Sequence, residues 1–275
     1  MTARQIDGRA LAADIVAEAA AIASTLPSPP TLAIVVATDD DATDWYVRNI
    51  QRTAARVGVT VRVERPTAST AEIGARLAAL SADGGVHGVI CQTPLPPGVD
   101  LADVAANIDP DKDVDGANPT SLGRLAAGRP AYAPATAAAV LEILEREQVP
   151  LEGAAVTVVG RSTVVGKPVA LLLLARHATV TVCHSRTADL AAACRGADVL
   201  VVAAGRPGLV STDAVKPGAV VIDVGTNPTP EGGLIGDVDP AVVAQAGALT
   251  PVPRGVGPVT TAVLLRHVVT AASLG

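Results

Sequence analysis

Phenylalanine is absent from the 275 residues, and aromatic residues of all kinds make up only 1% of them. The hydrophobic fraction of 49% therefore comes mostly from Ala, Val, Leu and Ile. That fraction is too high for an intrinsically disordered chain. Small and β-branched side chains of this kind suit parallel strands buried beneath helices. The composition predicts a protein with a large aliphatic core.

Basic residues, cysteines and long apolar runs are also scarce. With a net charge of −6, the chain lacks the basic excess of a general nucleic-acid binder. Cys91, Cys183 and Cys194 are odd in number and lack metal-ligand spacing, so we expect neither a disulfide framework nor a metal site. Charges interrupt every long apolar stretch, and MTARQIDGRALAADI lacks a secretion-signal pattern. We therefore expect a cytoplasmic protein with no membrane partner.

Helix-like and strand-like segments alternate along both halves of the chain. Apolar residues recurring at three and four predict helices at 8–26, 44–57, 70–83, 166–177 and 260–275. Short apolar runs predict strands at 31–38, 59–65, 85–92, 154–160, 178–185, 198–205 and 219–225. Residues 94–134, rich in Pro, Gly and Asp, predict an irregular functional loop or a domain joint. The alternation indicates an α/β protein of two lobes with parallel sheets and a cleft at the joint.

The segment VTVVGRSTVVGKPVALLLL suggests a nucleotide site in the second half. It places Gly160 at the end of a strand and Gly166 at the start of a helix, where backbone N–H groups can approach a phosphate. The pattern G-x-S-x-x-x-G is weaker than G-x-G-x-x-G, and an ordinary tight turn is the alternative.

The next strand indicates which dinucleotide is bound. It ends in His184, Ser185 and Arg186, where an NAD site would place an acid on the ribose 2′-hydroxyl, and no carboxylate occurs before Asp189. Polar and cationic groups suit a 2′-phosphate, so NADP is favoured. Arg161 is a second candidate for that phosphate, and each of these residues alone fits a solvated loop.

Three further stretches, ICQTPLPPGVD, IDPDKDVDGANPTSLGRL and LTPVPRGVGPVTTAVLL, are unlike generic loops, although each alone fits a stiff turn. Together with QIDGRALA, TDWYVRNIQRTAARVGV, VVGRSTVVGKPVALLL and GDVD, they resemble the FolD family of methylenetetrahydrofolate dehydrogenase/methenyltetrahydrofolate cyclohydrolases. The resemblance covers nearly the whole chain.

The resemblance implies a fold and partners. It implies an N-terminal α/β folate-binding lobe, residues 1–122 with a C-terminal helix at 258–275, and a Rossmann-like NADP-binding lobe with a parallel sheet, residues 123–257. The substrate would be a tetrahydrofolate one-carbon derivative bound between the lobes, and the protein would be a homodimer.

The resemblance also implies site residues, position by position. Tyr46 matches the tyrosine that stacks on the pterin, Gln92 the glutamine of V-Q-L-P-L-P, and Asp115 the second aspartate of D-V-D-G, which grips the pterin ring. The residues that match cofactor positions are Gly160, Arg161, Ser162 and Thr226, the last in place of an isoleucine along the nicotinamide nucleotide.

One position departs from the family pattern in a way that matters chemically. The motif around the tyrosine is Y-V-x-x-K, with a glycine twelve residues after the tyrosine. Tyr46 and Gly58 keep that spacing, but Ile50 stands where lysine is expected. Isoleucine cannot carry the protons that hydrolysis of the methenyl group requires, and the guanidinium groups of Arg48 and Arg52 stay protonated. We therefore expect an NADP-dependent methylenetetrahydrofolate dehydrogenase whose cyclohydrolase activity is weakened or lost.

Other departures leave alternatives open. Thr93 replaces a leucine beside Gln92, residues 134–139 read PATAAA where the family has P-C-T-P-x-G, and Arg254 replaces a glycine. Arg254 would contact a cofactor phosphate or narrow the folate entrance, and sequence drift explains each change equally well. The rival functions are a fully bifunctional enzyme, an oxidoreductase repurposed for another imine or amine, and a non-catalytic folate- or nucleotide-binding protein.

Overall fold

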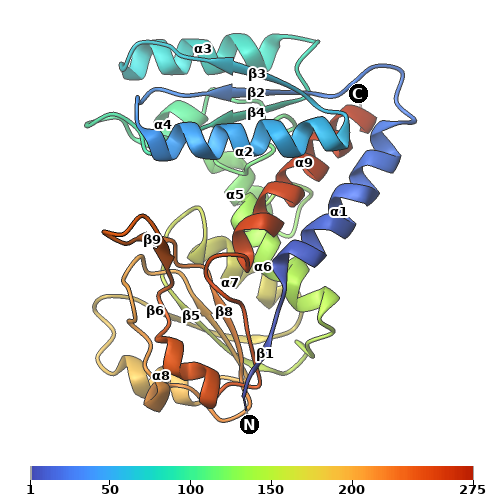
Figure 1. Cartoon of the computed structure of the whole chain (residues 1–275). Helices are drawn as coiled ribbons and strands as arrows, with labels where there is room; N and C mark the ends of the chain where they lie inside the picture. Colours follow the sequence, from blue (N-terminus) through green and yellow to red (C-terminus); the bar gives the residue numbers. More distant parts are fainter. Residues whose placement is uncertain (1, 275) are drawn as a thin grey trace. The chain divides into compact units, whose positions relative to one another are not determined.

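The computed structural model describes residues 2–274 and divides into two compact units (Figure 1). The six-stranded unit contains the chain up to Ala12 together with residues 136–260. The three-stranded unit contains residues 13–135 and the chain from Thr261 onward. Each unit has its own parallel sheet, which confirms the predicted α/β class.

The N-terminal strand belongs to the six-stranded unit, whereas the sequence assigned residues 1–122 to the other lobe. The strand β1 (Arg4–Gln5) pairs in parallel with β11 (Ala248–Leu249) at the edge of the six-stranded sheet. Both strands are two residues long, too short for an alternating pattern to show in the sequence. The other unit boundaries fall at the start of α6 (Ala135–Arg146) and within α9 (Val256–Leu274).

The three-stranded sheet has the order β3-β2-β4. The central strand β2 (Thr31–Val35) pairs in parallel with β3 (Thr60–Glu64) and with β4 (Gly88–Cys91). Two helices, α2 (Asp41–Val57) and α3 (Thr70–Ala82), cover opposite faces of this sheet (Figure 1). With both faces covered, β2 and β4 are buried almost throughout, as expected for parallel strands.

Capping residues define the ends of α2. Asp40 accepts a hydrogen bond from the Thr43 N–H over 2.8 Å at the N-terminal end, and Gly58 adopts φ 86° at the C-terminal end. The preceding helix α1 spans Gly8–Ala23. The buried face of α2 consists of Thr43, Val47, Ile50, Ala54 and Val57.

The stretch predicted to be irregular, residues 94–134, contains two short helices. Asp100 caps α4 (Leu101–Ala105), and Asn118 caps α5 (Pro119–Ala126), which has proline in its first turn. Capping and proline pre-organise these helices without an apolar period long enough to recognise in the sequence. The predicted irregular segment therefore contains two short helices, and a unit boundary falls just after it, as a domain joint would place it.

The six-stranded sheet is entirely parallel in the order β1-β11-β8-β7-β5-β6. Its longer strands are β5 (Ala155–Val159), β6 (Thr179–Cys183), β7 (Val199–Val202) and β8 (Val220–Asp223). Its further elements are α7 (Gly166–Leu174), α8 (Leu190–Arg195), the hairpin β9 (Asn227–Pro228) to β10 (Leu234–Ile235), and 3₁₀ turns at Thr212–Ala214 and Pro240–Ala244. Because the strands are parallel, their carboxyl ends share one edge.

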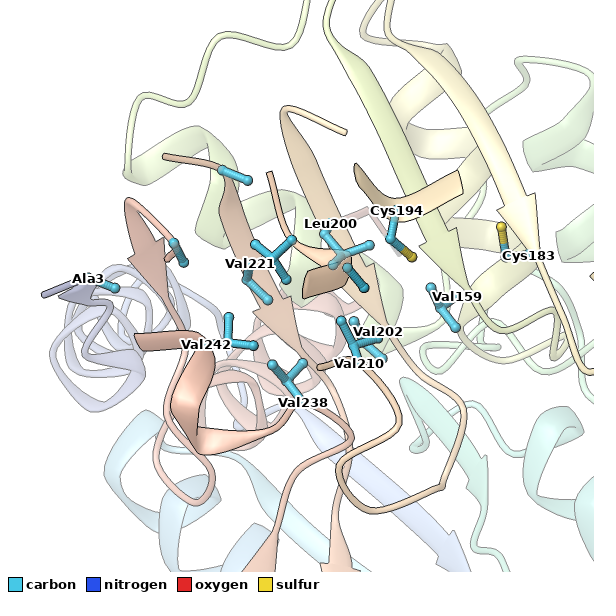
Figure 2. Packing of buried hydrophobic residues seen from close by; sticks show 14 residues of the cluster. Ala3, Val159, Cys183, Cys194, Leu200, Val202, Val210, Val221, Val238 and Val242 are labelled. Carbon is cyan, nitrogen blue, oxygen red and sulfur yellow. The ribbon is translucent and has the colours of Figure 1, made fainter. Parts of the chain in front are cut away.

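Figure 2 shows the aliphatic core on one face of this sheet, where valines of β5, β7 and β8 pack with valines of the loops and turns that cover them. Cys183 and Cys194 are buried in the same core with free thiols, where they fill space as small apolar side chains. Among residues 2–274, no helix combines the length and the apolarity needed to cross a membrane.

Candidate active site

In the three-stranded unit, the candidate site residues follow the carboxyl ends of β2 and β4. The chain leaves β2 toward β3 on one side, whereas β4 lies on the other side of β2. Parallel sheets bind ligands at such a reversal of strand order. Tyr46 lies on the helix that follows β2, and Gln92 follows β4 directly.

Tyr46 and Asp115 lie within electrostatic range of each other, although 68 residues separate them in the chain. Burial raises the pKa of the Tyr46 phenol, and the charge of Asp115 raises it further. Burial also raises the pKa of the Asp115 carboxyl to about 7, against the hydrogen bond from the Ala135 N–H, which is 3.2 Å from Asp115 Oδ1. Asp115 therefore changes charge close to neutral pH.

The two acids of the D-V-D-G segment have different surroundings. Asp113 is fully buried, and its carboxylate accepts hydrogen bonds from the N–H groups of Ala117 and Asn118 and from the Ser121 hydroxyl, over 2.6–2.9 Å. Asp113 thus fixes the loop, whereas Asp115 accepts one hydrogen bond from residues 2–274 and keeps further acceptor positions for a ligand.

Gln92 is held at the junction of two strands. Its backbone N–H donates to the Val35 carbonyl over 2.8 Å, and its side-chain Nε2 donates to the carbonyl of Thr93 over 2.7 Å. The first bond extends the ladder between β2 and β4 by one residue. The second orients the amide and leaves its oxygen as a possible acceptor.

Ile50 is completely buried, one helical turn after Tyr46. Lys112, the one lysine of the three-stranded unit, donates its Nζ to the Asp83 carbonyl over 2.8 Å at the end of α3. Arg48 and Arg52 are exposed on the outer face of α2, together with Trp45, which is 56% exposed. Neither arginine lies on the buried face of α2 that carries Ile50, and Lys112 lies outside α2.

Two groups near this site were missed at the sequence level. Burial raises the pKa of the Cys91 thiol to about 12, and the charge of Asp115 adds to the shift. Thr261 is 2% exposed and lies close enough to Tyr46 to influence the pKa of its phenol. Its hydroxyl nevertheless forms no hydrogen bond with good distance and angle to any described residue. Both lie in apolar sequence, and a threonine within an apolar helix is the only signal the sequence offers.

We expect a Thr261→Val variant to be more stable than the wild-type protein, because it removes a buried polar group without a full partner, which costs about 1–3 kcal/mol. Its KM for the pocket's ligand should rise if the hydroxyl orients Tyr46. Thr43→Val is the matched control, since Thr43 is also buried without a full partner but lies near Asp40. Thermal unfolding and KM measurements check both; a KM change in the control alone would contradict the assignment.

The nucleotide-type turn of the six-stranded unit is closely packed. A Cβ at Gly160, where φ is +127°, would lie 2.2 Å from the Ala203 carbonyl oxygen, and one at Gly166 would lie 2.1 Å from the Gly160 oxygen. Both positions therefore require glycine. Such contacts bring the end of β5 and the start of α7 together, as the glycines of a dinucleotide-binding turn do.

Ser162 closes the first turn of α7. Its Oγ accepts hydrogen bonds from the N–H groups of Val165 and Gly166, over 3.1 and 3.4 Å, and its carbonyl accepts one from Lys167 over 3.0 Å. The helix N-terminus is thus already occupied. Within the described chain the N–H groups of Arg161 and Thr163 have no partner, so the turn, rather than the helix, offers donors to a phosphate.

The strand β6 ends in a tight turn that orients His184. The His184 N–H donates to the Thr187 hydroxyl over 2.9 Å, and its Nδ1 accepts from the Arg186 N–H over 3.1 Å. The neutral imidazole therefore carries its proton on Nε2, which can donate to a ligand. Ser185 and Arg186 are exposed beside it. The closely packed glycine turn, its two free N–H groups and the exposed Arg186 together fit a dinucleotide with a 2′-phosphate.

Thr226 is exposed after β8, and two buried acids position the loops around it. Asp237 accepts hydrogen bonds from three successive N–H groups, those of residues 204–206, over 2.6–2.8 Å. Asp223 accepts from the N–H groups of Gly225, Asp237 and Val238 over 2.9–3.0 Å, and burial raises its pKa to about 6. The GDVD motif is therefore structural.

These features define a two-unit α/β protein with a dinucleotide-type turn in one unit and a Tyr–Asp site in the other. Family models match residues 6–115, described as "Tetrahydrofolate dehydrogenase/cyclohydrolase, catalytic domain", and residues 134–274, described as the "NAD(P)-binding domain" of the same family. The chain belongs to the tetrahydrofolate dehydrogenase/cyclohydrolase family, which confirms the resemblance and the expected nicotinamide cofactor.

Relatives match the chain over nearly its whole length. "Bifunctional protein FolD 1" of Saccharopolyspora erythraea is 58% identical, covering 98% of this chain and 94% of that protein. "Bifunctional protein FolD" of Parafrankia sp. is 59% identical, covering 98% and 99%. The crystal structure of the Trypanosoma brucei dehydrogenase-cyclohydrolase FolD, complexed with NADP cofactor and inhibitor, is 36% identical with a TM-score of 0.94, covering 100% and 98%.

Proposed function

We propose that this protein oxidises 5,10-methylenetetrahydrofolate to 5,10-methenyltetrahydrofolate with NADP⁺, and that it hydrolyses the methenyl product poorly. The family match supports the dehydrogenase, and the relative solved with NADP supports that cofactor. The observation that carries the weak hydrolysis is the fully buried hydrocarbon side chain of Ile50, where the family motif has lysine. The homodimer stays a prediction from the resemblance, and the cytoplasmic location stays a prediction from the charge and hydropathy pattern of the sequence.

Oxidation of the methylene bridge depends on positioning, because the adjacent nitrogen lone pair stabilises the cation and no side chain has to move a proton. Gly160, Arg161 and the exposed groups after β6 would hold NADP⁺, which supplies the hydride acceptor. Tyr46 would stack on the pterin, and the Asp115 carboxylate would accept hydrogen bonds from its N–H groups. All of these residues are retained.

Hydrolysis makes a different demand. The attacking water must lose protons, and a ring nitrogen must gain one as the bridge opens. A lysine whose pKa is lowered by burial suits that role, and such catalysis is typically worth ~10²–10⁴-fold. The aliphatic side chain of Ile50 supplies neither a base nor an acid.

The test is to follow methylenetetrahydrofolate oxidation with NADP⁺ by absorbance. NADPH and methenyltetrahydrofolate should form together, and the methenyl product should decay no faster than in an enzyme-free control. A wild-type rate of enzyme-dependent decay close to that of the Ile50→Lys variant would contradict weak hydrolysis, and absence of NADPH formation would contradict the dehydrogenase.

A second candidate is the fully bifunctional enzyme. The names of the relatives at 58% and 59% identity favour it. Asp115 offers a physical route, because its carboxyl has a pKa of about 7 and lies within electrostatic range of Tyr46. A carboxyl with that pKa can take up and release a proton near neutral pH. The Asp115→Asn variant considered below separates the two candidates.

A further inference from the structure

The loop that follows β7, residues 203–209, lies beside the nucleotide-type turn of the same unit. A Cβ at Gly160 would lie 2.2 Å from the Ala203 carbonyl oxygen, and the Ala203 N–H donates to the Val159 carbonyl over 2.7 Å. The turn and the loop are therefore in direct backbone contact at the carboxyl edge of the six-stranded sheet. Arg206 follows Ala203 by three residues, at most about 11 Å of extended chain.

The order of the strands indicates that a ligand binds at this contact. The chain leaves β5 toward β6 on one side, whereas β7 lies on the other side of β5. Parallel sheets bind dinucleotides where the strand order reverses in this way, with the pyrophosphate at the glycine turn. The loops after β5 and β7 therefore flank the position that a pyrophosphate would take.

The backbone of the loop after β7 has its hydrogen-bond donors already engaged. Asp237, which is fully buried, accepts from the N–H groups of residues 204–206 over 2.6–2.8 Å. The next residue is a proline, and the two N–H groups after it donate to main-chain carbonyls over 3.3 Å. The loop is thus held in place from inside the unit. Any donor that it offers to a ligand must come from a side chain.

Arg206 is the one cationic side chain of this loop, and it is exposed. Within residues 2–274 its guanidinium forms no ion pair or hydrogen bond, whereas its backbone N–H is fixed by Asp237 over 2.8 Å. The planar fork of an unpaired guanidinium matches the oxygens of a phosphate. A fixed backbone with an unpaired guanidinium is therefore suited to bind a phosphate at this edge.

The position of β7 indicates which phosphate Arg206 would bind. Ser185 and Arg186, the candidates for the 2′-phosphate at the end of β6, are two strand spacings from β7, about 10 Å. The strand β5 and its glycine turn lie between β6 and β7. The loop after β7 is therefore closer to a pyrophosphate at the turn than to a 2′-phosphate beside β6.

From the backbone contact, the engaged N–H groups and the unpaired charge, we propose that Arg206 binds the pyrophosphate of the nicotinamide dinucleotide. Its guanidinium would act from the β7 side, together with the free N–H groups of Arg161 and Thr163 in the turn. This inference rests on the proposed function, in which NADP⁺ accepts the hydride. Because NAD⁺ has the same pyrophosphate, Arg206 would strengthen the binding of both dinucleotides, whereas a contact to the 2′-phosphate discriminates between them.

Calorimetric titration of the protein without folate tests this assignment, with NAD⁺ measured by competition against NADPH. We expect Arg206→Ala to raise Kd for NADP⁺ and for NAD⁺ by the same factor, about tenfold. Arg206→Lys should recover part of the loss, because it restores the charge without the planar fork. Arg186→Ala should instead raise Kd for NADP⁺ alone.

Arg195→Ala is the matched control for the loss of one positive charge. Arg195 is also exposed and forms no ion pair or hydrogen bond through its side chain with any described residue. It lies at the end of α8 and precedes β7, so it is at the opposite edge of the sheet from Arg206. Its removal should leave both Kd values unchanged. Because neither arginine has a described side-chain partner, both alanine variants should unfold at the wild-type Tm.

The possible outcomes separate this inference from the proposed function. Unchanged Kd values in Arg206→Ala, beside NADP⁺ binding by the wild-type protein, would overturn the inference and leave the proposed function standing. A loss confined to NADP⁺ would assign Arg206 to the 2′-phosphate and overturn the pyrophosphate contact. A loss that lysine does not rescue, accompanied by a lower Tm, would show a structural role and overturn it too. If the wild-type protein bound neither dinucleotide, the inference and the proposed function would fail together.

Discussion

An Ile50→Lys variant is expected to hydrolyse methenyltetrahydrofolate ~10²–10⁴-fold faster than the wild-type protein, the usual gain from a side chain that carries a proton. The position is fully buried, one helical turn after Tyr46. Burial lowers the pKa of a lysine amine, which allows it to exchange protons near neutral pH. Oxidation with NADP⁺ should change little, because that step needs no proton carrier. Rates of methenyl decay and of NADPH formation measure the two activities separately.

Ile50→Met is the matched control, because it keeps an apolar side chain of similar volume and should leave hydrolysis unchanged. The lysine variant should be less stable than either protein. Its amine binds a proton more weakly in the folded state than in the unfolded state, so its stability relative to the wild-type protein should increase as pH rises. Equal hydrolysis by the folded lysine variant and the wild-type protein would contradict the role assigned to Ile50.

Asp115→Asn should lower kcat/KM for the folate about tenfold to a hundredfold, because it removes a charged acceptor from a buried site. In the wild-type protein kcat/KM should rise as pH increases through the pKa of about 7 and then level off, since the ionised form binds the pterin N–H groups. The variant should lack this inflection. Asp111→Asn, at an exposed acid of the same segment paired with Arg124, is the matched control.

Asp115 also makes the folding stability of the protein depend on pH. Its pKa is raised from 3.8 to about 7, so the folded state holds the proton more tightly than the unfolded state. The contribution of Asp115 to folding stability is therefore most favourable at low pH and is lost as pH rises toward 7. Asp115→Asn should gain stability relative to the wild-type protein over that range. If Asp115 also carries the proton for hydrolysis, the variant should lose whatever enzyme-dependent methenyl decay the wild-type protein shows.

The fold was predictable where apolar residues recur at regular spacing over a long segment of the sequence. The strands and helices around β2 and β5 follow directly from alternating apolar segments. The strands β1 and β11 were missed because two residues show no period, and the short helices α4 and α5 because caps rather than an apolar face define them. The helix α6 begins with ATAAAV, which is small or apolar on every side and gives no amphipathic stripe.

The site was predictable only where a motif carried it. Motif matching selected Tyr46 and Asp115, and the structure brings them together through contacts between distant segments that no local pattern encodes. The different surroundings of Asp113 and Asp115 depend on which carboxylate meets backbone N–H groups, and that follows from the folded loop. The φ of +89° at Arg254 likewise becomes visible only in the folded backbone.

The exposed tryptophan on α2 has a practical consequence. Trp45 is the only tryptophan, and both tyrosines, Tyr46 and Tyr132, also belong to the three-stranded unit, so the six-stranded unit has no ultraviolet fluorophore of its own. Because Trp45 is already 56% exposed, its emission should shift little on denaturation. Its neighbour is the residue proposed to stack on the pterin, so intrinsic fluorescence should report occupancy of that pocket selectively.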